Sequence, residues 1–159
     1  MAAETTDGGR VVLITGASAG IGRALAIKLA RDGWRVAVSA RREAALHAIG
    51  EEYTDLADRL HPYPLDVTDP EACQQVFSAV EAEIGEIDTV ILNAGDYDPM
   101  TLDEFDPALF RRLAEVNYLG AVNGVGAALG PMRARGRGQI LVTASLSAYR
   151  GLPQAAPYG

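Results

Sequence analysis

The first stretch that could do chemistry is a glycine-rich turn between an apolar run and a helical pattern near the N-terminus. Residues Val11–Ile14 have the length and β-branched content of a strand buried on both faces. Gly16, Gly20 and Gly22 follow, and the apolar pattern that resumes at Ile21 has helical spacing. A strand that passes through glycines into a helix start directs free N–H groups and the positive end of the helix dipole at an anion. The sequence therefore predicts a phosphate-binding turn.

Each glycine of this turn has a predicted role. Gly16 allows the tight turn off the strand, Gly20 lets a pyrophosphate approach the backbone, and Gly22 lets the helix pack close to the sheet. An ordinary glycine-rich loop is the alternative interpretation. The spacing, Gly-x-x-x-Gly-x-Gly, resembles the cofactor turn of the short-chain dehydrogenase/reductase family, and later segments match that family in the same order. By this resemblance the cofactor contacts of the turn are Thr15, Gly16, Ser18, Ala19, Gly20, Ile21 and Gly22.

Two arginines after the second predicted strand bear on the choice of cofactor. A carboxylate at the strand end would accept hydrogen bonds from the adenosine ribose 2′-OH of NAD, but here Ala40 is followed by Arg41 and Arg42. A guanidinium binds phosphate through forked, charge-assisted hydrogen bonds, so the sequence favours NADP(H) over NAD(H). The alternative is that both arginines are solvated charges at a helix start.

Two further segments resemble cofactor contacts of the family. Asp66 and Val67 resemble its adenine contact, with the carboxylate near the exocyclic amine and the Val67 backbone beside the ring. Asn93, Ala94 and Gly95 match the family's Asn-Ala-Gly, whose small residues let the backbone approach the ribose on the nicotinamide side. The alternatives are a turn or capping role for Asp66 and a simple strand-ending turn at residues 93–95.

Ser145 and Tyr158 resemble the catalytic pair of the family, because the tyrosine follows the serine by thirteen residues, the family's usual gap. The resemblance implies that Tyr158 protonates a carbonyl oxygen as hydride arrives on its carbon, or acts as base in alcohol oxidation. Ser145 would hydrogen-bond the same oxygen, with Ser147 as a competing hydroxyl. Asn117 resembles the family's active-site asparagine in a long helix, where asparagine is otherwise mildly unfavourable. Tyr149 is predicted to pack.

One member of the family's catalytic set lies outside this sequence. In the family a lysine follows the tyrosine by four positions, but here that position falls beyond Gly159, and the only lysine in the chain is Lys28. We therefore expect the 159 residues to be the N-terminal part of a longer protein. The resemblance implies an NADP(H)-dependent oxidoreductase acting on a carbonyl/alcohol pair. A dinucleotide-binding module without turnover, either a redox sensor or a truncated product, is the alternative.

These residues must be positioned by alternating strands and helices that form one parallel sheet. Strands are predicted at residues 11–14, 36–40, 61–65, 89–92 and 139–143. A second helix is expected to carry Leu46, Ile49, Tyr53, Leu56 and Leu60, and two helices are expected to start at Asp69-Pro70 and Asp106-Pro107, the latter running toward Arg133.

The predicted fold is a Rossmann-like, doubly wound α/β sheet of strand order 3-2-1-4-5, incomplete at its C-terminal end. The proline-rich segment 61–65 suits the edge that this order gives the third strand. Strand five would form a hydrophobic, uncovered edge. Because ligands of such sheets bind outside the carboxyl ends of the strands, the glycine turn, Arg41, Asp66, Asn93 and Ser145 are expected along one rim.

Composition limits the other classes of function. A net charge of −7 argues against nucleic acid or anionic membranes as partners, and no apolar run approaches the roughly 20 residues of a membrane helix. The single Cys73 excludes an internal disulfide and favours a cytoplasmic location, and no CxxC or HExxH pattern predicts a metal site. Residues 1–9 are expected to form a flexible tail and residues 10–159 a dinucleotide-binding domain. The resemblance implies a small-molecule substrate and a homo-oligomer.

Several other polar residues receive no catalytic prediction. His47 and His61 fall on the second helix and the edge strand, away from the predicted rim, so neither is proposed as a base. The acidic group after strand four, Asp96, Asp98, Asp103 and Glu104, could border a substrate entrance, but a solvated loop is the favoured interpretation.

Overall fold

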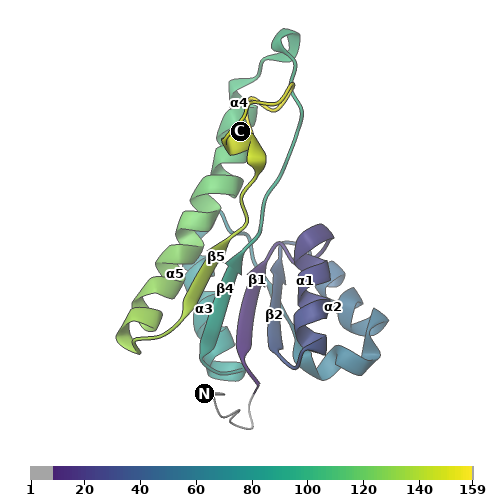
Figure 1. The fold of residues 1–159 in the computed structure, drawn as a ribbon, viewed down its shortest axis with the longest axis vertical. Helices are drawn as coiled ribbons and strands as arrows, with labels where there is room; N and C mark the ends of the chain where they lie inside the picture. Colours follow the sequence, from purple (N-terminus) through teal and green to yellow (C-terminus); the bar gives the residue numbers. More distant parts are fainter. Residues whose placement is uncertain (1–8, 159) are drawn as a thin grey trace.

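The computed structural model describes residues 9–158, and at its centre lies a five-stranded parallel sheet (Figure 1). The strands are β1 (Val11–Thr15), β2 (Arg35–Ala40), β3 (Leu60–Pro64), β4 (Ile87–Leu92) and β5 (Gln139–Val142). Their order is β3-β2-β1-β4-β5, which confirms the predicted doubly wound topology. Residues 1–8 of the predicted tail lie outside the described residues, as does Gly159.

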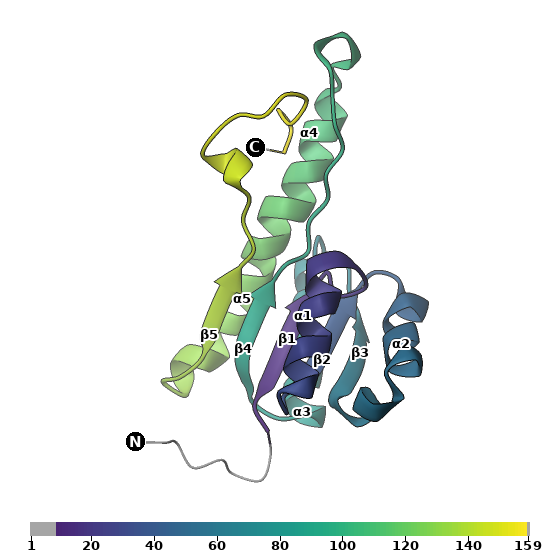
Figure 2. The same ribbon diagram turned by 45° about the vertical axis from the view of Figure 1, so that its right-hand side comes forward.

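Helices cover both faces of the sheet. They are α1 (Gly20–Arg31), α2 (Glu43–Glu52), α3 (Pro70–Glu83), α4 (Pro107–Ala114) and α5 (Gly120–Ala134). Helices α1 and α2 lie on one face, and α3 and α5 on the other (Figures 1 and 2). In β1, Val12 and Ile14 pack on the α1–α2 side, whereas Val11 and Leu13 pack on the α3–α5 side. Because both faces are covered, every residue of β1 is buried, as its apolar sequence predicts.

Capping fixes the starts of two helices. Asp69 precedes Pro70 and accepts hydrogen bonds from the backbone N–H groups of Glu71 and Ala72, at 2.9 and 3.0 Å. The side chain of Asp106, before α4, accepts one from the N–H of Ala108 at 2.8 Å. Both predicted helix starts are confirmed.

The second helix is shorter than its apolar spacing predicts. Helix α2 ends at Glu52, since Tyr53 leaves the helical conformation with φ −115° and ψ 68°. A 3₁₀ helix, Thr54–Arg59, follows, and Leu60 is already the first residue of β3. The chain must turn here to bring Leu60 beside β2. Leu56 is therefore buried from the 3₁₀ helix and Leu60 from β3. Their spacing in the sequence is the one that a longer α2 would also give.

Ile21 does not face the core, contrary to the predicted helical pattern. It is 68% exposed, and the buried face of α1 is formed by Gly22, Ala26, Ile27 and Ala30. The close contact made by Gly22 sets the rotation of the helix, and this rotation turns its neighbour Ile21 outward.

The predicted long helix is present with one irregular segment. Helix α4, a π-helical segment (Glu115–Leu119) and α5 follow one another without a break. In Figures 1 and 2 this rod extends past the carboxyl ends of the strands, and the chain after β4 runs beside its far part. No helix in the described part of the chain is long and apolar enough to cross a membrane.

The two sheet edges differ. Strand β3 pairs only with β2 and contains Pro62 and Pro64, as the edge position predicts. At the opposite edge, Leu141 and Val142 of β5 are exposed, which confirms the predicted uncovered strand.

Candidate cofactor-binding site

A cavity of about 750 Å³ opens at the carboxyl ends of β1, β2 and β4, the rim at which the sequence places its candidate residues. The predicted residues that line it are Gly16, Ser18, Ala19, Gly20, Ile21, Arg41, Arg42, Asp66, Val67, Asn93, Ala94, Gly95 and Tyr158. Thr15, Gly22, Asn117 and Ser145 are not among its lining residues. The structure thus gathers most of the predicted set in one cavity.

The glycine turn is packed tightly against the end of β4. Gly16 has φ +68°, and a Cβ there would lie 2.7 Å from the Cα of Ala94. A Cβ on Gly22 would lie 2.5 Å from the carbonyl oxygen of Gly16 and 2.6 Å from Nδ2 of Asn93. Side chains at either position would push helix α1 away from the sheet, so the predicted packing role of Gly22 has a measurable cause.

Gly20 faces the cavity and has a different role. Its φ is +56°, and a Cβ there would meet no atom within 4 Å. The preceding residue, Ala19, is the N-cap of α1 and offers no side chain to the first N–H groups of the helix, and the first turn holds no acidic residue. An uncapped helix start beside open space fits a bound anion such as the diphosphate of a dinucleotide.

Thr15 and Asn93 tie the turn to two strand ends. The buried Thr15 hydroxyl accepts hydrogen bonds from the N–H groups of Asn93 and Ala94, each at 3.1 Å. The Asn93 amide donates to the carbonyls of Thr15 and Gly16, each at 3.3 Å, and its Oδ1 accepts from the Thr143 hydroxyl at 3.2 Å. Thr15 therefore does not line the cavity but holds together the two segments that do, the glycine turn and the chain after β4.

Charged side chains also line the cavity. Arg41 and Arg42 are exposed, and no carboxylate of residues 9–158 forms an ion pair with either. Asp66 Oδ1 accepts from the N–H and the hydroxyl of Thr68, at 3.0 and 2.8 Å. The Thr68 N–H lowers the pKa of the Asp66 carboxyl, and the Thr68 hydroxyl and the Arg41 charge lower it further. Asp66 thus forms a turn and still lines the cavity as a carboxylate.

The three predicted catalytic residues occupy different surroundings. Tyr158 is half-buried and lines the cavity. Ser145 starts a short 3₁₀ helix (Leu146–Ala148), and its Oγ accepts from the N–H and the hydroxyl of Ser147, at 3.2 and 2.9 Å. Asn117 lies in the π-helical segment, where its side chain pairs with the backbone of Asp96. Tyr149 is 90% exposed, so the prediction that it packs is wrong: the 3₁₀ turn directs it to solvent.

Comparison with known proteins agrees with this geometry. The family model described as short chain dehydrogenase matches residues 10–159. The chain belongs to the short-chain dehydrogenase family. An uncharacterized oxidoreductase from Myxococcus xanthus is 36% identical over 149 residues, which cover 94% of this chain and 59% of that protein. A hydroxysteroid 11-beta-dehydrogenase 1-like protein from Xenopus tropicalis is 33% identical, covering 92% of this chain and 51% of the relative.

Solved structures of this family superpose closely on the chain. A variant of actinorhodin polyketide ketoreductase with NADPH gives a TM-score of 0.89 at 30% identity and covers 98% of this chain. An alcohol dehydrogenase from the archaeon Thermococcus sibiricus, complexed with 5-hydroxy-NADP, gives 0.85 at 35% identity and covers 94%. The chain spans 60% and 63% of those two structures, respectively, and about 60% of the Myxococcus xanthus relative.

The short-chain dehydrogenase fold also brings unpredicted residues to the cavity. Tyr97 and Thr143 line it, and neither was singled out by sequence reasoning. Both follow the carboxyl end of a strand, Tyr97 after β4 and Thr143 directly after β5. The rule that selected Asn93 applies to these two positions equally well, so the signal was present in the sequence.

Proposed function

We propose that this chain forms the NADP(H)-binding part of an oxidoreductase that transfers hydride between the nicotinamide and a carbonyl/alcohol substrate. The observation that carries the proposal is the convergence of the Gly16–Gly22 turn, Arg41 and Tyr158 on one cavity of about 750 Å³. Membership of a family of oxidoreductases and the likeness to NADP-bound structures support it.

The binding residues would divide the cofactor between them. The uncapped start of α1 and the open face of Gly20 would hold the diphosphate. Asp66 and Val67 would contact the adenine, and the backbone at Ala94 would approach the second ribose. When bound, the nicotinamide supplies or accepts the hydride.

The catalytic residues would then supply a proton and orient the substrate oxygen that receives it. Tyr158 would give the proton of its hydroxyl to the carbonyl oxygen in reduction and take it back in oxidation. Ser145 accepts two hydrogen bonds from Ser147, which leaves its own hydroxyl proton free to donate to the same oxygen. Asn117 would act from outside the cavity, through the backbone of Asp96.

The preference for NADP(H) would come from Arg41, supported by Arg42. Their guanidinium groups lie at the cavity without carboxylate partners among the described residues and can pair with a 2′-phosphate. Arg41→Asp should shift the ratio of kcat/KM for NADPH over NADH toward NADH by about 100-fold, because it removes a charged hydrogen bond and adds a repelling charge. Arg10→Asp, at an exposed arginine directly before the amino end of β1, is the matched charge control. An unchanged ratio in R41D would exclude Arg41 as the selector.

The proposed reaction is tested by NADPH oxidation against a panel of aldehydes and ketones, using the protein as its gene encodes it. Tyr158→Phe removes only the hydroxyl, so it should lower kcat by about 100-fold or more while NADPH binding is retained. Full turnover in Y158F would remove Tyr158 from the mechanism.

The alternative is a dinucleotide-binding module without turnover, either a redox sensor or a truncated product. One observation favours it: two of the predicted catalytic residues, Ser145 and Asn117, do not line the cavity. The intact mass of the native protein separates the two proposals. A mass near 16.8 kDa, together with NADPH binding and no turnover, would favour the binding module.

A further inference from the structure

Tyr97 contacts Tyr158, the proposed proton donor, in the lining of the cavity. The ring centroids of Tyr97 and Tyr158 are 5.2 Å apart with an interplanar angle of 79°, which is an edge-to-face contact. Both residues line the cavity, and Tyr97 is 51% exposed. We propose that Tyr97 is a positioning residue that seats the ring of Tyr158, and that Asn117 and Arg112 act by holding Tyr97 in place. The inference rests on the proposed function, in which Tyr158 transfers the proton.

The backbone before Tyr97 is fixed by an amide pair. The N–H of Asp96 donates to Oδ1 of Asn117 at 2.7 Å, and Nδ2 of Asn117 donates to the carbonyl oxygen of Asp96 at 2.9 Å. The N–H of Tyr97 then donates to the Asp96 carboxylate at 3.0 Å. Asn117 thereby attaches the residue before Tyr97 to the π-helical segment through both halves of its amide.

A single arginine holds the residues on both sides of Tyr97. The guanidinium of Arg112 forms ion pairs with the carboxylates of Asp96 and Asp98, the second at 2.9 Å. Each pair is half-exposed and would stabilise little by itself. Together they span the tyrosine and restrict the rotation of its backbone. The expected solvated acidic loop is thus partly ordered by a cation.

The segment that carries Tyr158 is attached to the same loop. The N–H of Met100 donates to the carbonyl oxygen of Gln154 at 3.0 Å, and the N–H of Tyr158 donates to the carbonyl oxygen of Ala155 at 2.9 Å. Gln154 has φ +62°, a conformation that side chains disfavour and that persists only where its surroundings hold it. The two segments are therefore joined through their backbones as well as through the two rings.

This arrangement assigns Tyr97 a role through its ring. A phenol that transfers a proton must hold its oxygen against the substrate, and a small displacement is costly for rate. The edge-to-face contact restricts the tilt of the Tyr158 ring without using its hydroxyl. The competing role is direct contact between the Tyr97 hydroxyl and the substrate, and replacement of the ring or of the hydroxyl alone separates the two.

The test compares Tyr97→Ala with Tyr97→Phe in the protein as its gene encodes it. Loss of the ring in Y97A should lower kcat about 10-fold and raise the solvent deuterium isotope effect on kcat, because proton transfer becomes slower than the other steps. Y97F keeps the ring and should stay within about two-fold of the parent. Arg112→Gln releases both carboxylates and should lower kcat in the same direction by a smaller factor. Tyr149→Ala removes an exposed tyrosine outside the cavity and is the matched control.

Two controls keep the outcomes distinct. Titration of NADPH by its fluorescence must give the same number of binding sites in every variant, which excludes loss of folded protein as the cause. Y97F as slow as Y97A, or Y97A with parental kcat and isotope effect, overturns the positioning role while Y158F remains inactive. Full turnover in Y158F would remove Tyr158 from the mechanism, and the inference with it, whereas a parent protein that oxidises NADPH with no aldehyde or ketone of the panel would overturn the proposed function itself.

Discussion

At the scale of single residues, the hydroxyl of Thr15 stabilises the junction between the glycine turn and β4. It is buried and accepts two backbone N–H groups, those of Asn93 and Ala94. Ser39, on the neighbouring strand, is equally buried, yet its hydroxyl has no partner within residues 9–158. Removal of the Thr15 hydroxyl would therefore leave two N–H groups without a hydrogen-bond acceptor, whereas removal of the Ser39 hydroxyl would leave none.

Thr15→Val should lower the free energy of unfolding by about 1–3 kcal/mol, because it leaves two buried N–H groups without an acceptor. Ser39→Ala should leave it unchanged or raise it by about 1 kcal/mol, because an unpaired hydroxyl is removed from the core. Urea unfolding of the two variants beside the parent measures both changes. A loss in S39A as large as that in T15V would mean that the Ser39 hydroxyl has a partner.

The residues that line the cavity could be predicted from their types and spacing, whereas the contacts of their side chains could not. The glycine spacing and the arginines after β2 identified the cavity because their chemistry depends on backbone position and charge. Asn117 was expected among the catalytic residues, but its side-chain amide forms two hydrogen bonds with the backbone of Asp96. No spacing in the sequence predicts that contact, because its two partners are 21 residues apart and meet only through tertiary packing.

At the scale of elements, the edge strand β3 carries a histidine whose charge the fold disfavours. His61 lies among Arg35, Asp58 and Glu83, and its buried Nε2 has no hydrogen-bond partner in the described chain. Burial lowers the pKa of His61, and the Arg35 charge lowers it further. The folded state therefore favours the neutral imidazole.

Below about pH 6.5 the unfolded chain binds a proton at His61 before the folded chain does. The free energy of unfolding should consequently fall as the pH drops from about 6.5 toward the folded-state pKa, by up to about 1.4 kcal/mol per pH unit. His61→Asn should remove this slope, as measured by urea unfolding at several pH values. His47→Gln, on exposed α2, is the control and should leave the slope in place. An identical slope in H61N would assign it to other groups.

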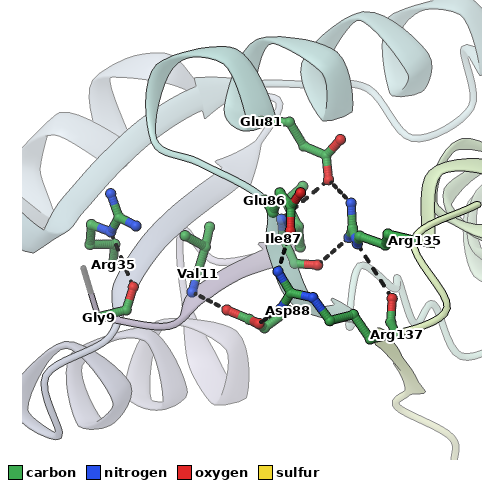
Figure 3. A network of polar contacts seen from close by, with 9 residues as sticks. All are labelled: Gly9, Val11, Arg35, Glu81, Glu86, Ile87, Asp88, Arg135 and Arg137. Carbon is green, nitrogen blue, oxygen red and sulfur yellow. Dashed lines mark hydrogen bonds and ion pairs between the residues drawn. The ribbon is translucent and has the colours of Figure 1, made fainter. Parts of the chain in front are cut away.

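At the end of the sheet opposite to the cavity, an ionic network joins α3, β4 and the turn before β5 (Figure 3). Arg135, at the end of α5, donates to Glu81 of α3 and to the carbonyl of Ile87 in β4. Its side chain is only 14% exposed, and Glu81 also accepts from the N–H of Ile87 at 3.2 Å. The network connects the start of β4 to the turn that leads into β5, and so supports a strand that has one sheet neighbour.

Arg135→Gln should lower the free energy of unfolding by about 2 kcal/mol, because it leaves a largely buried carboxylate and a carbonyl without their charged donor. The matched control is Lys28→Gln, which breaks an exposed pair with Asp32 and should cost less than about 0.5 kcal/mol. Equal effects of the two substitutions would show that the network is solvated and contributes little.

Element types could be predicted from the sequence far better than element ends. The alternation of apolar runs and helical patterns predicted one parallel sheet, and the prolines of β3 agree with the edge position that the doubly wound order gives it. The end of α2 could not be predicted from spacing, because Leu56 and Leu60 are buried by a 3₁₀ turn and a strand at intervals that a helix would also produce. The spacing of apolar residues predicts which residues are buried, whereas tertiary packing determines the type of element that carries them.

At the scale of the whole molecule, parallel topology explains why residues distant in sequence form one site. The turn after β1, the arginines after β2 and the segment after β4 meet because all strands point the same way. A ligand that binds them together would join both halves of the sheet, so its binding free energy should appear in the stability of the entire fold. This linkage gives a test of the site that needs no substrate.

NADPH at about 100 times its Kd should add about 2.7 kcal/mol to the free energy of unfolding and raise Tm by roughly 5–10 °C. NADH at the same concentration should raise it less. Gly20→Asn should abolish this shift and leave the Tm of the free protein within about 2 °C of the parent, because asparagine tolerates φ +56° and its side chain would fill the open space at the start of α1. Gly126→Ala, whose Cβ also meets no atom within 4 Å, is the control and should keep the full shift. An unchanged NADPH shift in G20N would mean that the diphosphate binds elsewhere, and the glycine turn would lose its assigned role.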